Sequence, residues 1–170
     1  MLIDKVPAVT FTIYGQPATK KNSPQLVRGR SIVLPSKAYR AYAKEFHSQL
    51  IAMRLPHYDG AVALSVAYYL QDRRHYPDLN GLIQATQDLL SDEYTRLNGK
   101  RVLAKRWVLA DDRIVKCLDG CCIAGIDKEE PKAVITITPV DVDPVHETDP
   151  YLLRLLKEKA YGKDKGICGE

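Results

Sequence analysis

The chain has 170 residues, which is enough for one domain with a hydrophobic core and short for two. Apolar residues make up 45% of it and charged residues 27%, a composition that excludes an intrinsically disordered chain. The net charge is only +4, no apolar run predicts a transmembrane helix, and the first residues lack the pattern of a secretory signal, so we expect a cytoplasmic protein.

The first half of the chain predicts strands on either side of a long helix. Apolar and polar residues alternate at residues 9–14, as in a half-buried strand, and a short return strand is expected at residues 31–34. Aromatic and aliphatic residues then recur at helical spacing from Lys37 to about Arg54, with Ser36 as the natural N-cap. The clearest alternation lies at residues 62–70 and predicts the main strand of the fold.

Positive charge is concentrated between Gln16 and Arg54. This segment holds eight basic residues against one acidic residue, Glu45. So basic a segment within a nearly neutral chain indicates either a surface that binds a polyanion or an ordinary solvated face rich in lysine. The basic residues are Lys20, Lys21, Arg28, Arg30, Lys37, Arg40, Lys44 and Arg54.

The second half opens with a predicted helix from about Leu79 to Asp92. Asp78 precedes it as the N-cap or in the first turn, where the helix dipole favours a carboxylate. Residues 91–105 are hydrophilic and predict a linker with at most one helical turn. Further strands are expected at residues 113–118 and 134–138.

This order of elements predicts an α+β fold, a small mixed β-sheet with two main helices packed on one face. The composition changes after Pro139, where an acidic, turn-rich stretch precedes a short amphipathic helix predicted at residues 151–160. We therefore expect one domain at residues 1–140 and a C-terminal tail at residues 141–170.

The residues suited to chemistry are mainly carboxylates. The sequence contains no glycine-rich nucleotide loop, no nucleophile elbow and no HExxH zinc motif, and its four histidines are scattered. Asp78 starts a helix and Asp112 starts a strand, where side chains from distant segments can meet. Asp88 belongs to a polar stripe with Asn80 and Gln84, about 15 Å along the helix from Asp78, and would reach the same ion poorly. Taken singly, each of these aspartates is explained by a cap, a turn or a solvated helix face.

The cysteines offer a second, weaker pattern. Cys117, Cys121 and Cys122 form a C-x3-C-C cluster, which is not a paired CxxC zinc motif, and Cys168 lies far away in the tail. We expect ordinary reduced cysteines. The alternative is a zinc-stabilised interaction module that uses the basic segment to contact protein or RNA.

Several motifs, in order, resemble those of the RusA-like endonucleases of phages and prophages. Residues 73–85, RRHYPDLNGLIQA, resemble the family's basic residues, D-L-D-N sequence and apolar helix, and Asp88-Leu89-Leu90 matches its D-A-L. Residues 110–115, ADDRIV, resemble its D-D-x-x-V. Weaker similarities include Gly15-Gln16-Pro17 and the Pro35-Ser36 helix start, so the resemblance spans about residues 9–138.

The resemblance implies a homodimeric, metal-dependent endodeoxyribonuclease that resolves Holliday junctions or related flaps and forks in DNA recombination and repair, in the cytoplasm of a bacterium or a phage-infected host. It implies Mg²⁺, with Mn²⁺ as a substitute, held by Asp78, Asp112 and Asp111. Catalysis would involve Asp78, Asp112, Asn80 and Asp88. DNA phosphates would be bound by Lys20, Lys21, Arg28, Arg30, Arg73 and Arg74.

Three positions depart from the family pattern. Asn80 stands where the family has its second aspartate, Gly81 where it has asparagine, and Gln84 where it has a helix lysine. Asn80 retains an oxygen donor without the charge. The departures leave two alternatives: an active nuclease, or a catalytically impaired protein that binds branched DNA.

Overall fold

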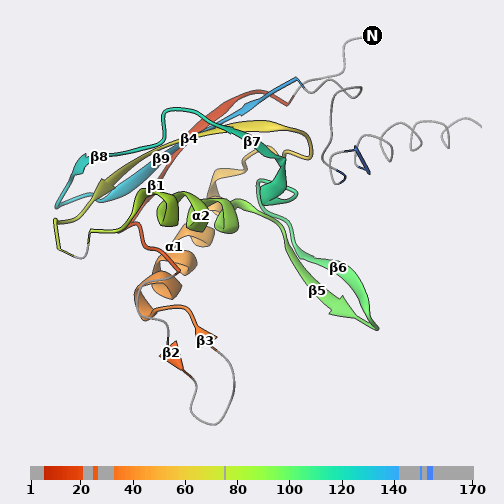
Figure 1. Ribbon diagram of the computed structural model, residues 1–170, viewed down its shortest axis with the longest axis horizontal. Helices are drawn as coiled ribbons and strands as arrows, with labels where there is room; N and C mark the ends of the chain where they lie inside the picture. The colour runs from red at the N-terminus through yellow and green to blue at the C-terminus, as the bar shows by residue number, and fades with distance from the viewer. Residues whose placement is uncertain are drawn as a thin grey trace, which may run out of the picture.

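The computed structural model describes residues 6–20, 25–26, 33–74, 76–141, 150 and 153–154. Its centre is a five-stranded sheet in the order β1–β9–β4–β7, in which β8 also pairs with β4 (Figure 1). The strands are β1 (Val9–Tyr14), β4 (Val62–Leu70), β7 (Val115–Leu118), β8 (Cys122–Ile126) and β9 (Lys132–Pro139). Because β9 is antiparallel to β1 and β4 whereas β7 and β8 are parallel to β4, the sheet is mixed, as predicted.

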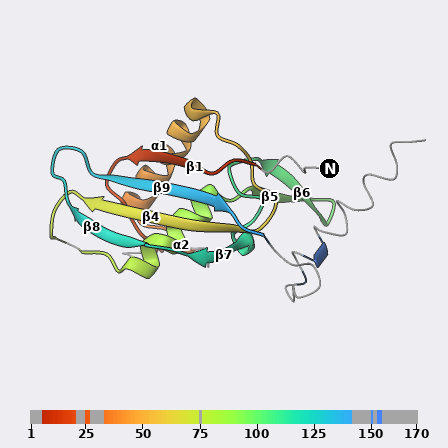
Figure 2. The ribbon, with the colours of Figure 1, turned by 90° about the horizontal axis from the view of Figure 1, so that it is seen from above.

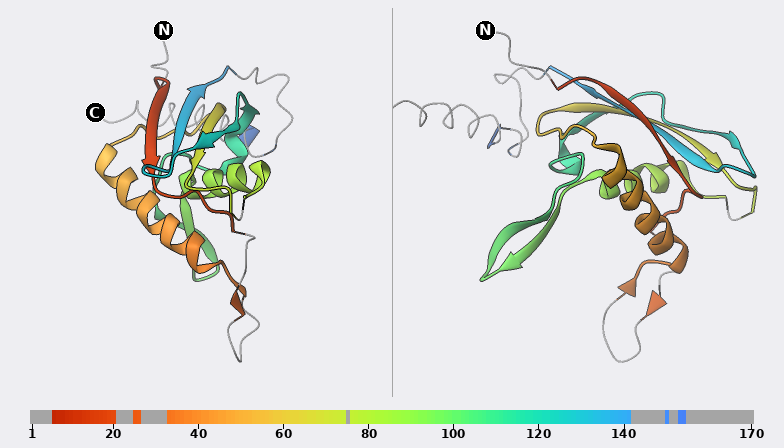
Figure 3. Two further views of the ribbon diagram at one scale, coloured as in Figure 1. Left: turned by 90° about the vertical axis from the view of Figure 1, so that its left-hand side faces the viewer. Right: turned by 180° about the vertical axis from the view of Figure 1, so that it is seen from behind.

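One face of the sheet forms the core. Along β4, Val62, Leu64, Val66, Tyr68 and Leu70 are buried, and every residue between them is only partly covered. The alternation seen in the sequence therefore matches the pleat of the strand. Both helices pack on this buried face, and Figures 2 and 3 show them on the same side of the sheet. The predicted α+β fold with two helices on a mixed sheet is confirmed.

The two helices begin where the sequence predicts. α1 (Lys37–Met53) starts after Ser36, whose Oγ accepts a hydrogen bond from the Tyr39 N–H at 3.1 Å. α2 (Leu79–Leu90) starts after Asp78, which caps it in the same way. α2 ends slightly earlier than predicted because the backbone of its C-cap residue, Ser91, is extended, with φ −83° and ψ 145°.

The predicted linker at residues 91–105 is wrong. The chain forms a β-hairpin there, β5 (Glu93–Leu97) and β6 (Lys100–Lys105), which extends away from the sheet and helices (Figures 1 and 3). Asn98 and Gly99 form the turn with φ of 51° and 77°, as the Asn-Gly pair of a two-residue hairpin requires. All residues of both strands are exposed, so neither strand shows the alternation that reveals a half-buried strand.

Two other elements differ from expectation. The predicted strand at residues 113–118 begins with a 3-10 turn, η1 (Asp112–Ile114), and only β7 is extended. β8 was missed because its five residues, CIAGI, have a weak pattern and become a strand by pairing with β4. A short pair, β2 (Gln25–Leu26) and β3 (Val33–Leu34), confirms the return strand in part, since residues 31–32 lie outside the described residues.

The predicted tail helix at residues 151–160 lies outside the described residues apart from Leu153 and Arg154, which are helical. The core of the described chain is drawn from residues within the predicted domain, from Val6 to Val140. None of the helices in the described ranges is long and apolar enough to cross a membrane.

Candidate functional site

The predicted site residues lie at opposite ends of α2. At its C-terminal end, the Leu90 carbonyl accepts hydrogen bonds from the N–H groups of Val108 and Leu109 at 3.0 and 2.8 Å. Asp111 and Asp112 follow directly, so they lie beside this end of the helix. Asp78 and Asn80 lie at the other end, about 18 Å away for a helix of this length. The reason is topological: α2 runs back along the sheet after β4, which separates its first residues from the start of β7.

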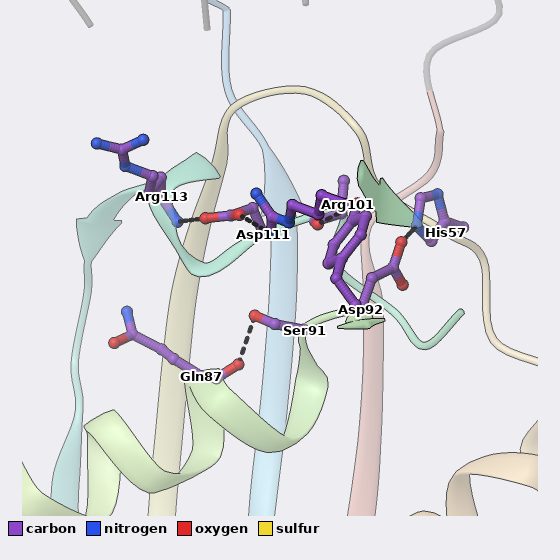
Figure 4. Close-up of polar contacts among 9 residues, drawn as sticks. His57, Gln87, Ser91, Asp92, Arg101, Asp111 and Arg113 are labelled. Carbon is purple, nitrogen blue, oxygen red and sulfur yellow. Dashed lines mark hydrogen bonds and ion pairs between the residues drawn. The ribbon is translucent and has the colours of Figure 1, made fainter. Parts of the chain in front are cut away.

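Three carboxylates gather at the C-terminal end of α2, and we refer to Asp88, Asp111 and Asp112 as the carboxylate cluster. Partial removal of water, a hydrogen bond with Asp111 and the negative charges of Asp111 and Asp88 raise the pKa of Asp112 above its ordinary value. Asp111 caps η1 by accepting a hydrogen bond from the Arg113 N–H at 3.2 Å. Figure 4 shows Asp111 between Arg113 and Arg101, with the last turn of α2 below it in this view.

The helix makes this end of the site more negative. The C-terminus of an α-helix carries the equivalent of about half a negative charge, and a basic residue in the last turn would offset it. The last turn of α2 has none. The dipole and the carboxylate cluster therefore act together to attract a cation.

Two basic side chains from outside α2 meet that negative charge. Lys20 Nζ lies 2.6 Å from Asp88 Oδ2, and Arg101 Nη2 lies 3.4 Å from Asp111 Oδ2. Arg101 also stacks on the ring of Tyr94, with its guanidinium carbon 3.9 Å from the ring centroid. The cluster is thus bordered by cations that come from the loop after β1 and from the hairpin.

Asp78 has a different environment. Its Oδ1 accepts a hydrogen bond from the Gly81 N–H at 2.6 Å, which satisfies one of the free donors at the start of α2. A Cβ added at Gly81 would lie 2.8 Å from Asp78 Oδ2 and 3.1 Å from Thr19 Cγ2. A side chain at position 81 would therefore collide with the carboxylate of the capping Asp78, and the cap favours glycine there. Asn80 is exposed on the same turn.

Magnesium would fit only part of the predicted ligand set. In the part of the chain that the structure describes, no three His, Cys, Asp or Glu side chains form a group that could hold a metal ion. Mg²⁺ is commonly held by one or two carboxylates together with waters and substrate phosphates. The neighbouring carboxylates of Asp111 and Asp112 meet that requirement, whereas Asp78 belongs to the other end of α2.

A scan against protein-family models finds no match, and a search of curated proteins finds no relative. The resemblance to RusA-like endonucleases therefore stays a prediction that rests on the motifs.

The predicted phosphate-binding residues fall into three groups. Lys20 lies beside the carboxylate cluster, and Arg73 and Arg74 are exposed on the loop before Asp78, at the opposite end of α2. Lys21, Arg28 and Arg30 lie outside the described residues, as does His75. The described basic residues thus border α2 at both ends.

Sequence reasoning missed Arg101 and Asp92. Asp92 accepts a hydrogen bond from the Trp107 N–H at 2.6 Å and pairs with His57 Nε2 at 3.0 Å (Figure 4), which ties together the base of the hairpin and the segment before β4. Arg101 reaches the carboxylate cluster only because the hairpin starts and ends beside it. The Asn98-Gly99 turn was the signal that could have revealed the hairpin.

The cysteines do not form a zinc site with the other described residues. Cys117 and Cys122 are exposed, whereas Cys121 is half-buried and directs its Sγ towards the Leu64 carbonyl at 3.5 Å. Burial raises the pKa of the Cys121 thiol, which disfavours the thiolate that zinc requires. These contacts favour the ordinary reduced cysteines expected from the sequence.

Proposed function

We propose that this protein is a metal-dependent, structure-selective endodeoxyribonuclease that cleaves four-way junctions or related branched DNA. The observation that carries the proposal is the carboxylate cluster at the negative end of α2, bordered by Lys20 and Arg101. Phosphodiester hydrolysis needs a place where anionic ligands attract a hard cation and basic groups attract phosphate. The motif resemblance independently assigns Asp112 to such a site.

In this proposal Asp111 and Asp112 hold Mg²⁺ or Mn²⁺, and Asp88 adds negative charge nearby. The cation, when bound, polarises a phosphate oxygen and lowers the pKa of a water ligand. Lys20 and Arg101 bind phosphate oxygens on either side of the cluster and orient the strand to be cut. Arg73 and Arg74 bind the backbone at the other end of α2. Phosphate contacts carry little sequence information, so selectivity for DNA structure follows.

The deciding experiment is cleavage of a labelled synthetic four-way junction and of a linear duplex of matched sequence. Each substrate is incubated with Mg²⁺, with Mn²⁺ and with a chelator. We expect cutting of the junction with either metal, no cutting with the chelator and little cutting of the duplex. Equal cutting of both substrates would contradict structure selectivity, and cutting in the chelator would contradict metal dependence.

A second candidate is a protein of the same fold that binds branched DNA without cutting it. The position of Asp78 favours it, because this carboxylate lies at the other end of α2 from the carboxylate cluster and Asn80 adds no charge beside it. In the same experiment this protein would retard the junction in a gel and leave it intact with every metal.

A further inference from the structure

The β5–β6 hairpin carries its own concentration of positive charge. Residues 93–106 contain five basic residues and one acidic residue, Glu93. None of them belongs to the basic segment at residues 16–54. The basic residues are Arg96, Lys100, Arg101, Lys105 and Arg106, and all are exposed.

The pairing of β5 with β6 places two of these positive charges directly across from each other. Arg96 is the direct cross-strand partner of Arg101, and Tyr94 is the partner of Leu103. These four residues share one face of the ribbon, the face on which Arg101 covers the ring of Tyr94. Like charges directly opposite each other destabilise a hairpin, and a two-stranded ribbon without further packing is only marginally stable in water. Asp111 already pairs with Arg101, and an anionic ligand beside Arg96 would reduce the repulsion that remains.

Apolar side chains are also exposed along the hairpin. The exposed fractions are 64% for Leu97, 43% for Leu103 and 38% for Val102. A positively charged ribbon with exposed apolar side chains is suited to a nucleic-acid groove, where phosphates lie on both sides and base edges lie between them. The same charge makes a second copy of the hairpin a poor partner.

The hairpin begins and ends at the candidate site. The Tyr94 hydroxyl donates to the Ala110 carbonyl at 3.4 Å, and Arg101 pairs with Asp111. A five-residue strand extends about 16 Å, and the major groove of B-DNA is about 12 Å wide and admits a two-stranded β-ribbon. DNA that received the hairpin would therefore lie against the carboxylate cluster.

We propose that the β5–β6 hairpin is a DNA-binding arm that enters the major groove beside the scissile phosphate, with Arg96 and Lys100 on the phosphate backbone. This inference rests on the proposed function, because the arm would hold the substrate of that site. The arm binds double-stranded DNA with little dependence on sequence, and it does so with or without the metal.

The test compares Arg96→Glu with Lys128→Glu, a matched change of net charge in the loop between β8 and β9, where Lys128 is exposed. Binding of a labelled duplex and a four-way junction is measured by fluorescence anisotropy over a range of salt concentrations, in chelator so that no cleavage occurs. We expect Arg96→Glu to weaken binding about ten-fold and to reduce the salt slope by about one, as for the loss of one phosphate contact. We expect less than about a two-fold change for Lys128→Glu, since that loop lies away from the arm.

Folding is checked by thermal unfolding of both variants. Arg96→Glu converts a like-charge pair into an opposite-charge pair with Arg101, so the hairpin should be no less stable than in the wild type. If Arg96→Glu binds DNA more weakly and its melting temperature is unchanged, the result supports the assignment of the hairpin as a DNA-binding arm.

The other outcomes separate the two proposals. If the wild type binds DNA and Arg96→Glu binds it equally well, the hairpin is not a DNA-binding arm and the proposed function stands. The same conclusion follows if Arg96→Glu and Lys128→Glu weaken binding equally. If the wild type binds neither DNA at low salt, the proposed function fails and the arm with it. The major groove of duplex RNA is too narrow for the ribbon. If Arg96→Glu weakened binding to duplex RNA as much as binding to duplex DNA, the assignment to the major groove would be overturned. Unchanged DNA binding with an altered oligomer mass would instead assign the arm to a second copy.

Discussion

At the scale of single residues, Asp112 is a carboxylate whose pKa is raised by partial loss of water and by neighbouring carboxylates. Asp111 and Asp88 both place negative charge on it. We expect Asp112→Asn to reduce junction cleavage by about 100-fold or more, equivalent to about 2.7 kcal/mol of barrier, because a cation ligand is lost. Junction binding should persist, since the basic side chains remain. Cleavage rates and gel retardation measured side by side check both expectations.

The matched control is Asp119→Asn, an exposed aspartate in the turn between β7 and β8. It should cut at the wild-type rate. If Asp112→Asn also cut at that rate, Asp112 would have no part in holding the cation.

Asp78 illustrates how one aspartate can be structural at a position where the motif implies catalysis. Because its side chain accepts the Gly81 N–H, Asp78→Ala should lower the free energy of unfolding by about 1 kcal/mol, and Asp78→Asn, which retains an N-cap oxygen, should lower it by less. Urea unfolding of the two variants measures the difference. Equal stability of Asp78→Ala and the wild type would contradict the cap.

Cleavage by Asp78→Asn then tests its second role. Loss of cutting in a variant of normal stability would give Asp78 the metal-binding role that the resemblance implies. Retained cutting would assign the cation to the carboxylate cluster alone.

At the scale of elements, His47 joins α1, α2 and the base of the hairpin. Its Nε2 donates to the Leu89 carbonyl at 3.0 Å, and its ring stacks on Trp107 with 4.0 Å between the centroids. Burial lowers the pKa of His47 below 6.5, the Leu89 hydrogen bond and Glu93 oppose the shift, and Lys105 adds to it. The folded protein therefore prefers the neutral imidazole.

This preference predicts a pH dependence of stability. The unfolded chain binds a proton at His47 below about pH 6.5, whereas the folded chain does so only at lower pH. The contribution of His47 to the free energy of unfolding should thus be fully present above pH 6.5. It should decrease as the pH falls from 6.5 towards the pKa of His47 in the folded protein. His47→Gln, which can still donate to Leu89, should lose this part of the dependence. Melting temperatures of both proteins at pH 7.5 and 5.5 measure it, and parallel declines would contradict the assignment.

At the scale of the whole molecule, resolution of a four-way junction requires two cuts, and the described part of each chain has one carboxylate cluster. We therefore expect a homodimer, as the resemblance implies, with a mass in solution of about twice the 19.1 kDa of one chain. Light scattering after size exclusion measures the mass. A monomeric mass, or a plasmid cruciform that is nicked rather than linearised, would contradict paired cutting.

The sequence by itself determined the elements whose side chains divide into a buried face and an exposed one. β1 and β4 alternate along their length, and α1 and α2 begin directly after Ser36 and Asp78, residues that cap through their own side chains. Their bounds follow from local spacing and local hydrogen bonds, which require no distant partner. The α+β class follows from the order of these elements.

Only the tertiary structure decided which carboxylates meet. The motifs group Asp78 with Asp112, but the return of α2 along the sheet places them at opposite ends of the helix and brings Asp88 to Asp112 instead. The structure alone also reveals β8, which is extended because β4 offers it an edge, and places Arg101 on Asp111 from a hairpin exposed on both faces. The physical reason is the same in each case: these features depend on contacts between residues distant in sequence, and no local periodicity encodes such contacts.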